Sequence, residues 1–220
     1  MPPSLPDLSL HVLYQDDYVL VANKPAGLMV EPDRNGHPNL LYQVRRYLKD
    51  AAGGAGAVYA QHLHRLDRPV SGIVLFAVKR EVLHTLSNQF AERRVQKYYQ
   101  ALTATAPLAP EGTLAHWHRK EKKRAVIADQ DMPHAEAARL DYRVAPRGQG
   151  RYLWDITLHT GKYHQIRAQL AHVGCPIVGD SVYGSTATYL PDAIALHAAR
   201  LGFTHPITGQ VMMIAQDAPF

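Results

Sequence analysis

The segment HRLDRPVSG, residues 64–72, holds residue types suited to nucleophilic or acid–base chemistry. Arg65 stands two positions before Asp67, Arg68 follows it directly, and a run of apolar β-forming residues occupies 73–78. A carboxylate displayed just before a buried strand, with cations beside it, suits a nucleophile or a general base, because either role needs the ionised form. A structural salt bridge at the entry to a strand has the same pattern, so this segment alone leaves both interpretations open.

Two other chemistries are compatible with parts of this segment. His62, His64 and Asp67 are residue types that ligate zinc, and a metal-dependent hydrolase is therefore one alternative. However, Leu66 and Arg68 stand where a metallo-β-lactamase pattern needs an Asp and a His, and the neighbouring arginines would repel a dication. HRLD is also similar to a kinase catalytic loop, but the chain has no Gly-rich nucleotide loop and no DFG triplet. We therefore expect neither a metal nor a nucleotide cofactor.

A second polar cluster, TGKYHQIRAQL, occupies residues 160–170. Here a strand ends, Gly161 turns the chain and a helix begins, and the first turn of that helix offers backbone N–H groups suited to a phosphate. The polar residues of the helix are His164, Gln165 and Arg167, and those expected to face inward are Ile166, Leu170 and Val173. An ordinary amphipathic helix with a solvated arginine is the alternative. Two Gly- and Pro-rich clusters follow at 174–184 and 196–209, and both indicate turns.

Hydrophobic periodicity predicts the elements that position these clusters. Strands are expected at 10–14, 18–23, 73–78, 97–103, 112–118, 124–128, 138–144, 152–159, 196–203 and 210–215, and helices at 39–49, 80–93 and 163–173 with Gly174 as a C-cap. The strands outnumber the helices and do not alternate regularly with them. This favours an α+β fold with a mixed or antiparallel central sheet over a doubly wound fold. We expect a loose N-terminal arm at 1–9 and a single catalytic domain over 10–220. This domain would have one or two lobes.

Composition narrows the partners and the compartment. Lys and Arg total 24 against 19 Asp and Glu, and this net charge of +5 favours a polyanionic partner, because cations bound to phosphates release counterions. Cys175 is the one cysteine, so no disulfide can form within the chain, which suits a reducing compartment. The sequence shows no secretory signal and no apolar run of about 18 residues. A cytoplasmic protein without a membrane segment is therefore expected.

Four motifs in order identify a family resemblance. NKPAG at 23–27, HRLDxxxSG, TGxxHQIRxxL with GxPIxGDxxYG, and LHAxxLxFxHPxTG together resemble the RluA family of RNA pseudouridine synthases, from about Leu10 to the C-terminus. The resemblance implies a pseudouridine synthase fold and isomerisation of uridines in rRNA or tRNA without a cofactor. The S4-type RNA-binding module of larger members is not expected, so RNA would be recognised by the catalytic domain, acting as a monomer. A catalytically silent RNA-binding protein on the same fold is the alternative function.

The resemblance also implies site residues. Asp67 matches the catalytic aspartate, and Arg65 matches the arginine that enters the RNA stack when the target uridine flips out. Tyr99, two residues after Lys97, matches the tyrosine that packs on the target base, with Tyr98 as the alternative. Arg167 matches the arginine that pairs with the catalytic carboxylate.

Further substrate contacts are expected from His64, Ile166 and Leu170, which lie in the same motifs, with Ile166 as a pocket wall. Val70 departs from the family, which usually has a threonine there, so a local hydrogen bond is in doubt. Basic residues at 93–94, Lys97 and 116–124 are candidate contacts to the RNA backbone, or else solvated charges.

Overall fold

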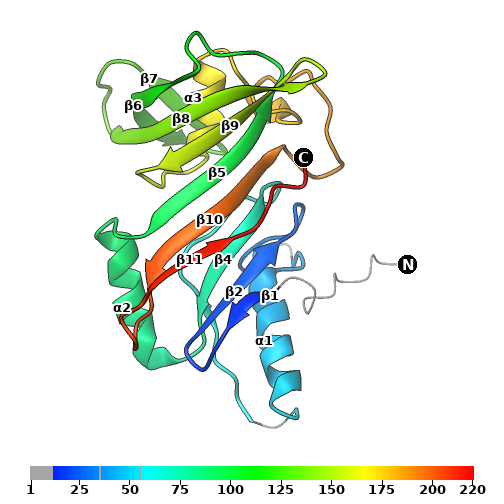
Figure 1. The fold of residues 1–220 in the computed structure, drawn as a ribbon, viewed down its shortest axis with the longest axis vertical. Helices are drawn as coiled ribbons and strands as arrows, with labels where there is room; N and C mark the ends of the chain where they lie inside the picture. Colours follow the sequence, from blue (N-terminus) through cyan, green and yellow to red (C-terminus); the bar gives the residue numbers. More distant parts are fainter. Residues whose placement is uncertain (1–11, 35, 55) are drawn as a thin grey trace. The chain divides into compact units, whose positions relative to one another are not determined.

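A computed structural model describes residues 12–34, 36–54 and 56–220, so the predicted arm at 1–9 lies outside the described residues. Strands outnumber helices, and the predicted α+β class with a mixed central sheet is confirmed (Figure 1). The chain forms two compact units. The first runs to Val95 and takes in Leu201–Gln216, and the second comprises Gln96–Arg200 and Asp217–Phe220. A single domain over 10–220 stays a prediction.

The first unit begins with two of the predicted strands, which form a hairpin. Strand β1 (Val12–Gln15) pairs antiparallel with β2 (Val19–Lys24). Asp16 closes the turn, because its Oδ1 accepts hydrogen bonds from the backbone N–H groups of Tyr18 and Val19 at 2.8 and 2.9 Å. Strand β2 then pairs antiparallel with β4 (Ser71–Ala77), in a register that sets Lys24 opposite Gly72. This register brings the NKPAG and HRLDRPVSG motifs to neighbouring strand ends.

Two helices and three shorter stretches of strand complete this unit. Helix α1 (Leu40–Ala51) starts where Asn39 Oδ1 accepts from the Tyr42 N–H at 2.9 Å, which is a side-chain N-cap. Helix α2 spans Arg80–Ala91, β3 is Gln61–His62, and β11 is Val211–Ala215. Strand β10 (Leu196–Thr204) contributes its last four residues to this unit.

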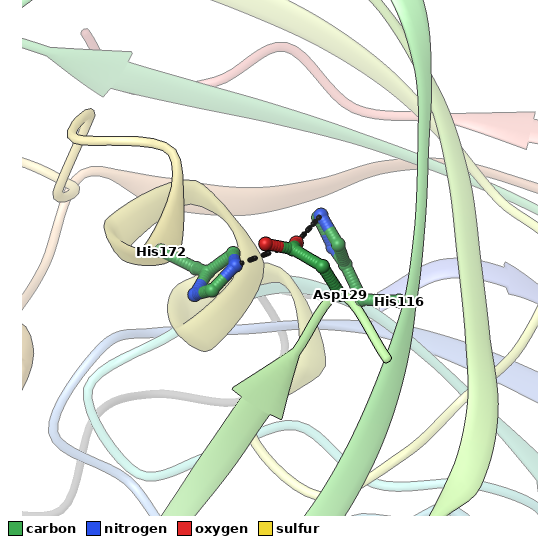
Figure 2. Close-up of side chains that lie close together, drawn as sticks. All are labelled: His116, Asp129 and His172. Atoms are coloured by element: carbon green, nitrogen blue, oxygen red, sulfur yellow. Dashed lines mark hydrogen bonds and ion pairs between the residues drawn. The ribbon is translucent and has the colours of Figure 1, made fainter. Parts of the chain in front are cut away.

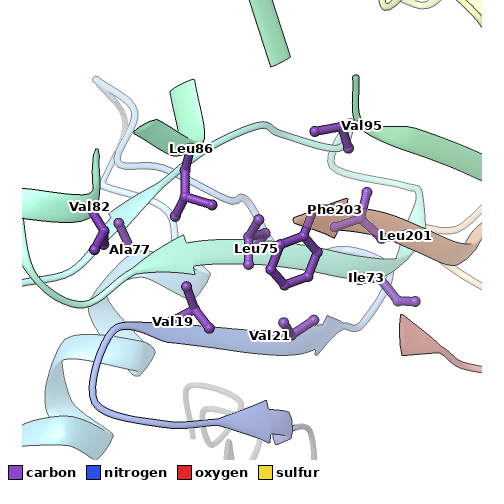
Figure 3. Close-up of a cluster of buried hydrophobic side chains, with 10 residues drawn as sticks. All are labelled: Val19, Val21, Ile73, Leu75, Ala77, Val82, Leu86, Val95, Leu201 and Phe203. Carbon is purple, nitrogen blue, oxygen red and sulfur yellow. The ribbon is translucent and has the colours of Figure 1, made fainter. Parts of the chain in front are cut away.

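The core of the first unit is a cluster of apolar side chains from β2, β4, α2 and β10, together with one residue that precedes β5 (Figure 3). Its members are Val19, Val21, Ile73, Leu75, Ala77, Val82, Leu86, Val95, Leu201 and Phe203. Strand β4 is buried at every residue after Ser71, as its continuous apolar run predicts for a strand covered on both faces. The residues that follow Asp67 are thereby anchored in the core.

The second unit contains an antiparallel series of long strands. Its order is β5 (Gln96–Thr103), β9 (Arg151–Leu158), β8 (Glu136–Gly148), β6 (Glu111–Glu121) and β7 (Arg124–Ala128). The expected spans for β6 and β8, 112–118 and 138–144, were too short. Their ends are exposed and carry no apolar alternation, yet backbone pairing continues there, as between Glu121 and Arg124.

Helix α3 (Gln165–His172) differs from its prediction in length and in burial. It is shorter than 163–173, because His164 before it has a left-handed backbone, with φ of 52°, and Gly174 after it has φ of 76°. Gln165 to Leu170 are all buried, which contradicts the alternative of an ordinary amphipathic helix with a solvated arginine. A short 3-10 helix, η2 (Ser181–Tyr183), follows. No helix among the described residues is long and apolar enough to cross a membrane.

Candidate active site

The predicted site residues fall in both units, and each group is described within its own unit. His64, Arg65 and Asp67 belong to the first unit. Tyr99, Ile166, Arg167 and Leu170 belong to the second, where the last three share α3.

Backbone hydrogen bonds join the NKPAG turn to the turn that carries Asp67. The Gly27 N–H donates to the Arg68 carbonyl at 2.8 Å, and Arg68 Nε donates back to the Gly27 carbonyl at 3.0 Å. Gly27 has φ of 83°, a conformation that glycine adopts without strain. Two motifs that lie far apart in the sequence therefore form one structural element.

Lys24 lies beneath this element and is completely buried. Its Nζ donates to the carbonyl oxygens of Pro25 at 2.9 Å, Leu28 at 2.7 Å and Arg68 at 3.2 Å, so each of the three ammonium protons has an acceptor. Burial lowers the pKa of Lys24 to about 7, the negative charge of Asp67 opposes that shift, and the charge of Arg68 adds to it. Lys24 is thus electrostatically coupled to Asp67.

Lys24 is a residue whose role could not be inferred from the sequence motifs. Its position at the end of an apolar run, directly before a proline, was the available signal, since a lysine that ends a buried strand has to find partners there.

Asp67 is half-buried, and the turn around it is anchored on both sides. Leu66 and Val70 are buried, at 8 % and 2 % exposure, and the Val70 N–H donates to the Asp67 carbonyl at 3.0 Å. The backbone therefore closes this turn, whatever the side chain at position 70. The valine packs in the interior, and Gly72, with φ of 120°, is the second residue of β4.

Arg65 and His64 differ in exposure and in partners. Arg65 is exposed and forms an ion pair with Glu31, which His62 Nε2 also approaches at 3.3 Å. The His64 ring stacks on Phe90 with centroids 5.1 Å apart, and its Nε2 accepts from the Leu75 N–H at 3.2 Å. This hydrogen bond uses the Nε2 lone pair that zinc would need, so the structure disfavours the His62, His64 and Asp67 metal alternative. Substrate contact by His64 stays a prediction.

The two candidate tyrosines lie on opposite faces of β5, because successive side chains of a strand alternate. The Arg200 guanidinium lies over the Tyr98 ring, 4.7 Å from the ring centroid. Tyr99 is half-buried and lies in register with Ile156 of β9. Tyr98 thus makes a cation–π contact within this unit, and stacking of Tyr99 on the target base stays a prediction.

Arg167 has a carboxylate partner within the second unit. Its Nε and Nη2 contact Asp180 Oδ2 and Oδ1 at 2.7 and 2.9 Å, and both side chains are buried. Its guanidinium also lies 5.2 Å from the centroid of the Tyr183 ring. Asp180, from the GDSVYG motif, is a partner that the sequence analysis missed. The pairing of Arg167 with Asp67 stays a prediction.

Ile166 and Leu170 are buried, at 5 % and 0 % exposure. The burial of Leu170 gives it a packing role in this unit, and the prediction that either residue contacts the substrate stays untested.

One group of side chains in the second unit has the composition of a metal site. His116, Asp129 and His172 bring their ligand atoms within 4.8 Å of one another (Figure 2). His172 Nε2 lies 2.9 Å from Asp129 Oδ1, and His116 Nε2 lies 3.7 Å from the same oxygen. Burial and the charge of His172 lower the pKa of His116.

A chain of hydrogen bonds sets the tautomer of His116. The backbone N–H of Lys162 donates to Gln165 Oε1, so Gln165 Nε2 faces Gln169 Oε1 and donates to it at 3.0 Å. Gln169 Nε2 must then donate to His116 Nδ1 at 3.0 Å. With Nδ1 as acceptor, neutral His116 carries its proton on Nε2 and offers no lone pair there. The cluster is therefore better suited to hydrogen bonding with Asp129 than to holding a cation.

A family model and curated relatives of this chain point to the same class of protein. A family model described as RNA pseudouridylate synthase matches residues 18–172. The tRNA pseudouridine synthase C of Pasteurella multocida is 34% identical over 226 residues, which cover 94% of this chain and 90% of that protein. The ribosomal large subunit pseudouridine synthase D of Nitrosomonas europaea is 32% identical over 224 residues, covering 96% of this chain and 63% of that protein.

Solved structures share the fold. Human RNA Pseudouridylate Synthase Domain Containing 1 superposes with a TM-score of 0.80 at 23% identity, over 100% of this chain and 87% of that one. Human RNA Pseudouridylate Synthase Domain Containing 4 gives a TM-score of 0.77 at 22% identity, over 96% of this chain and 90% of that one. At these identities the likeness supports the fold alone.

Proposed function

This chain belongs to the RNA pseudouridine synthase family, an isomerase family, and from that premise we propose that it converts uridines of rRNA or tRNA to pseudouridine with Asp67 as the catalytic carboxylate. The relatives named above act, by their names, on tRNA and on the large ribosomal subunit, which supports these two RNA classes as substrates.

The observation that carries the proposal is the charge arrangement around Asp67. Partial burial of a carboxyl group disfavours its ionised form, and a nearby cation favours it. Lys24 supplies that cation from a fixed position, because three carbonyl oxygens hold its ammonium group. The carboxylate of Asp67 thus lies within electrostatic range of the Lys24 amino group, in a turn that the core anchors.

The reaction breaks the bond between ribose C1′ and uracil N1, turns the ring and joins C1′ to C5, and the C5 proton is then lost while a nitrogen gains one. Asp67 acts either by attacking C1′ to form a glycosyl ester or by removing the 2′ proton to give a glycal. Both routes need an ionised carboxylate. Because the product is an isomer of the substrate, no oxidant, reductant or group donor is consumed.

The target uridine has to leave the RNA stack, at a cost of a few kcal/mol. Arg65 is proposed to fill the vacated space. Because its side chain is exposed, Arg65 can leave Glu31 and contact RNA without a rearrangement of the core. Tyr99 is proposed to stack on the uracil, a contact worth about 1–3 kcal/mol. Arg167 is proposed to hold the carboxylate of Asp67 in position.

The test replaces Asp67 by asparagine, which keeps the shape of the side chain and removes its charge. Tritium release from RNA labelled at uracil C5 should fall at least about a thousandfold, since neither route proceeds without the carboxylate. Binding of the same RNA should persist within a few fold. Near-normal tritium release by Asp67→Asn would exclude Asp67 as the catalytic residue.

The same assay separates an enzyme from a catalytically silent RNA-binding protein, because only the enzyme releases tritium. The substrate itself is identified by mapping pseudouridines in total RNA from a deletion strain and from its parent. A pseudouridine lost in the deletion strain should return with the wild-type gene and stay absent with Asp67→Asn.

A further inference from the structure

A cavity of about 1110 Å³ in the second unit is lined by none of the residues assigned above to catalysis, although Tyr183 in its lining also contacts Arg167. It lies between the β6–β7 hairpin, α3 and η2. Its lining includes the hairpin cations Lys122, Lys123 and Arg124, with His172 and Tyr183 from the other two elements. Ligand pockets commonly measure about 300–1,000 Å³, so this cavity is large enough for an extended ligand.

The rim of the cavity is cationic. Lys122, Lys123 and Arg124 are consecutive and exposed at the tip of the hairpin. Glu121 beside them does not offset this charge, because Arg119 already pairs with its carboxylate. Three adjacent cations of this kind are complementary to the phosphates of a polyanion.

The floor of the cavity is apolar and includes three alanines. Ala125, Ala168 and Tyr183 form a buried cluster, with Ala171 packed against it. The Tyr183 hydroxyl accepts from the Ala125 N–H at 2.8 Å, which anchors the ring. The Arg124 guanidinium lies 5.2 Å from the centroid of that ring, so one rim cation is held over the floor before any ligand binds.

An apolar floor below a cationic rim matches the two ends of a nucleotide, a flat base and an anionic phosphate. A duplex keeps its bases stacked and offers only phosphates to such a cavity, whereas a single strand can place an unstacked base in it. Resting on the proposed function, we propose that this cavity binds a single-stranded segment of the substrate RNA other than the target uridine, with phosphates on Lys122 to Arg124 and a base on the alanine floor.

The first test removes two rim cations, Lys122→Ala with Lys123→Ala. The probe is a short fluorescein-labelled RNA of A and C only, which contains no target uridine, and its affinity is measured by anisotropy over a range of KCl concentrations. Each lost contact to a single strand should reduce the slope of log K against log salt by about 0.7, or about 1.4 for the pair. The matched control, Arg46→Ala with Lys49→Ala on the exposed face of α1, removes equal charge and should retain the wild-type slope.

The second test fills the floor without changing charge. Ala171→Leu keeps good helix propensity in α3 and should weaken binding of the same RNA about tenfold while leaving the salt slope unchanged. Ala51→Leu, at the exposed end of α1, is the control and should bind as the wild type does.

The outcomes distinguish this inference from the proposed function. Tritium release by the wild type supports the function, and wild-type affinity and slope in the rim variant would then overturn the cavity proposal alone. An equal loss of affinity for a duplex of the same length would also overturn it, because the rim would then be a duplex phosphate contact. If the wild type releases no tritium from any RNA tested, the proposed function fails, whatever the cavity binds.

Discussion

At the scale of single residues, the buried amino group of Lys24 interacts electrostatically with the carboxylate of Asp67. An ammonium group in the interior is costly unless it is hydrogen-bonded, and Lys24 has an acceptor for every proton. Loss of one proton leaves two donors for three carbonyls and removes the positive charge near Asp67. The protonation state of Lys24 should therefore affect both stability and turnover.

The pH dependence of these two properties should run in opposite directions. The folded-state pKa of Lys24, about 7, lies below its unfolded value, so the unfolded chain binds more protons above pH 7. The free energy of unfolding should therefore rise with pH, by at most about 1.4 kcal/mol per pH unit from this residue. Turnover should fall over the same range, because Asp67 loses its cation. Both changes can be measured between pH 7 and about 8.5, stability by urea unfolding and turnover by tritium release. Tyrosines ordinarily ionise above this range.

The control for this prediction is Lys24→Met, which cannot titrate. Its unfolding free energy should lack the rise that the wild type shows over this range, and its turnover should be low at every pH. The prediction would be contradicted if the wild type and Lys24→Met showed the same pH dependence of stability and of turnover.

At the scale of elements, a buried ion pair attaches α3 to the segment before η2. Arg167 and Asp180 are 5 % and 1 % exposed at the side chain, and their contact is bidentate. Removing one partner of such a pair leaves the other charge buried without compensation. The position of Arg167, and hence its proposed action on Asp67, depends on this contact.

Asp180→Ala should lower the free energy of unfolding by about 3–5 kcal/mol, as measured by urea denaturation. Glu111→Ala is the control, because it breaks an ion pair at the surface. The side chains of that pair, Glu111 and Arg143, are 64 % and 81 % exposed. Exposed pairs of this kind contribute about 0–1 kcal/mol. Equal effects of the two substitutions would show that the buried pair does not stabilise α3.

At the scale of the whole molecule, the net charge of +5 and the 13 histidines should contribute to the proposed binding of RNA. Histidines protonate between about pH 8 and pH 5, so the positive charge grows as pH falls. The pKa values of His62 and His116 are lowered, chiefly by burial, and these two contribute little to that growth.

RNA affinity should therefore increase from pH 8 to pH 6, by about tenfold at low salt, and the difference should shrink at high salt, because screening weakens exposed charges. Anisotropy titrations with the RNA of A and C would measure this change. A pH effect that high salt does not reduce would show that binding changes through conformation instead of charge.

Most element positions could be predicted from the sequence, because hydrophobic periodicity is a local property. The hairpin from β1 to β2, the buried strand β4 and the two helices of the first unit lie within a few residues of their predicted spans. The ends of β6 and β8 could not be predicted, since exposed residues without apolar alternation follow the backbone pairing of a neighbouring strand there.

The sequence by itself determined the fold class, the order of the motifs and the family, because these depend on residue types and their spacing. Only the tertiary structure decided the surroundings of the motif residues. Lys24 beneath the Asp67 turn, Asp180 on Arg167 and the burial of α3 all depend on contacts between segments far apart in the chain. Such contacts leave no local pattern, because a buried polar residue and a solvated one have the same letter in the sequence.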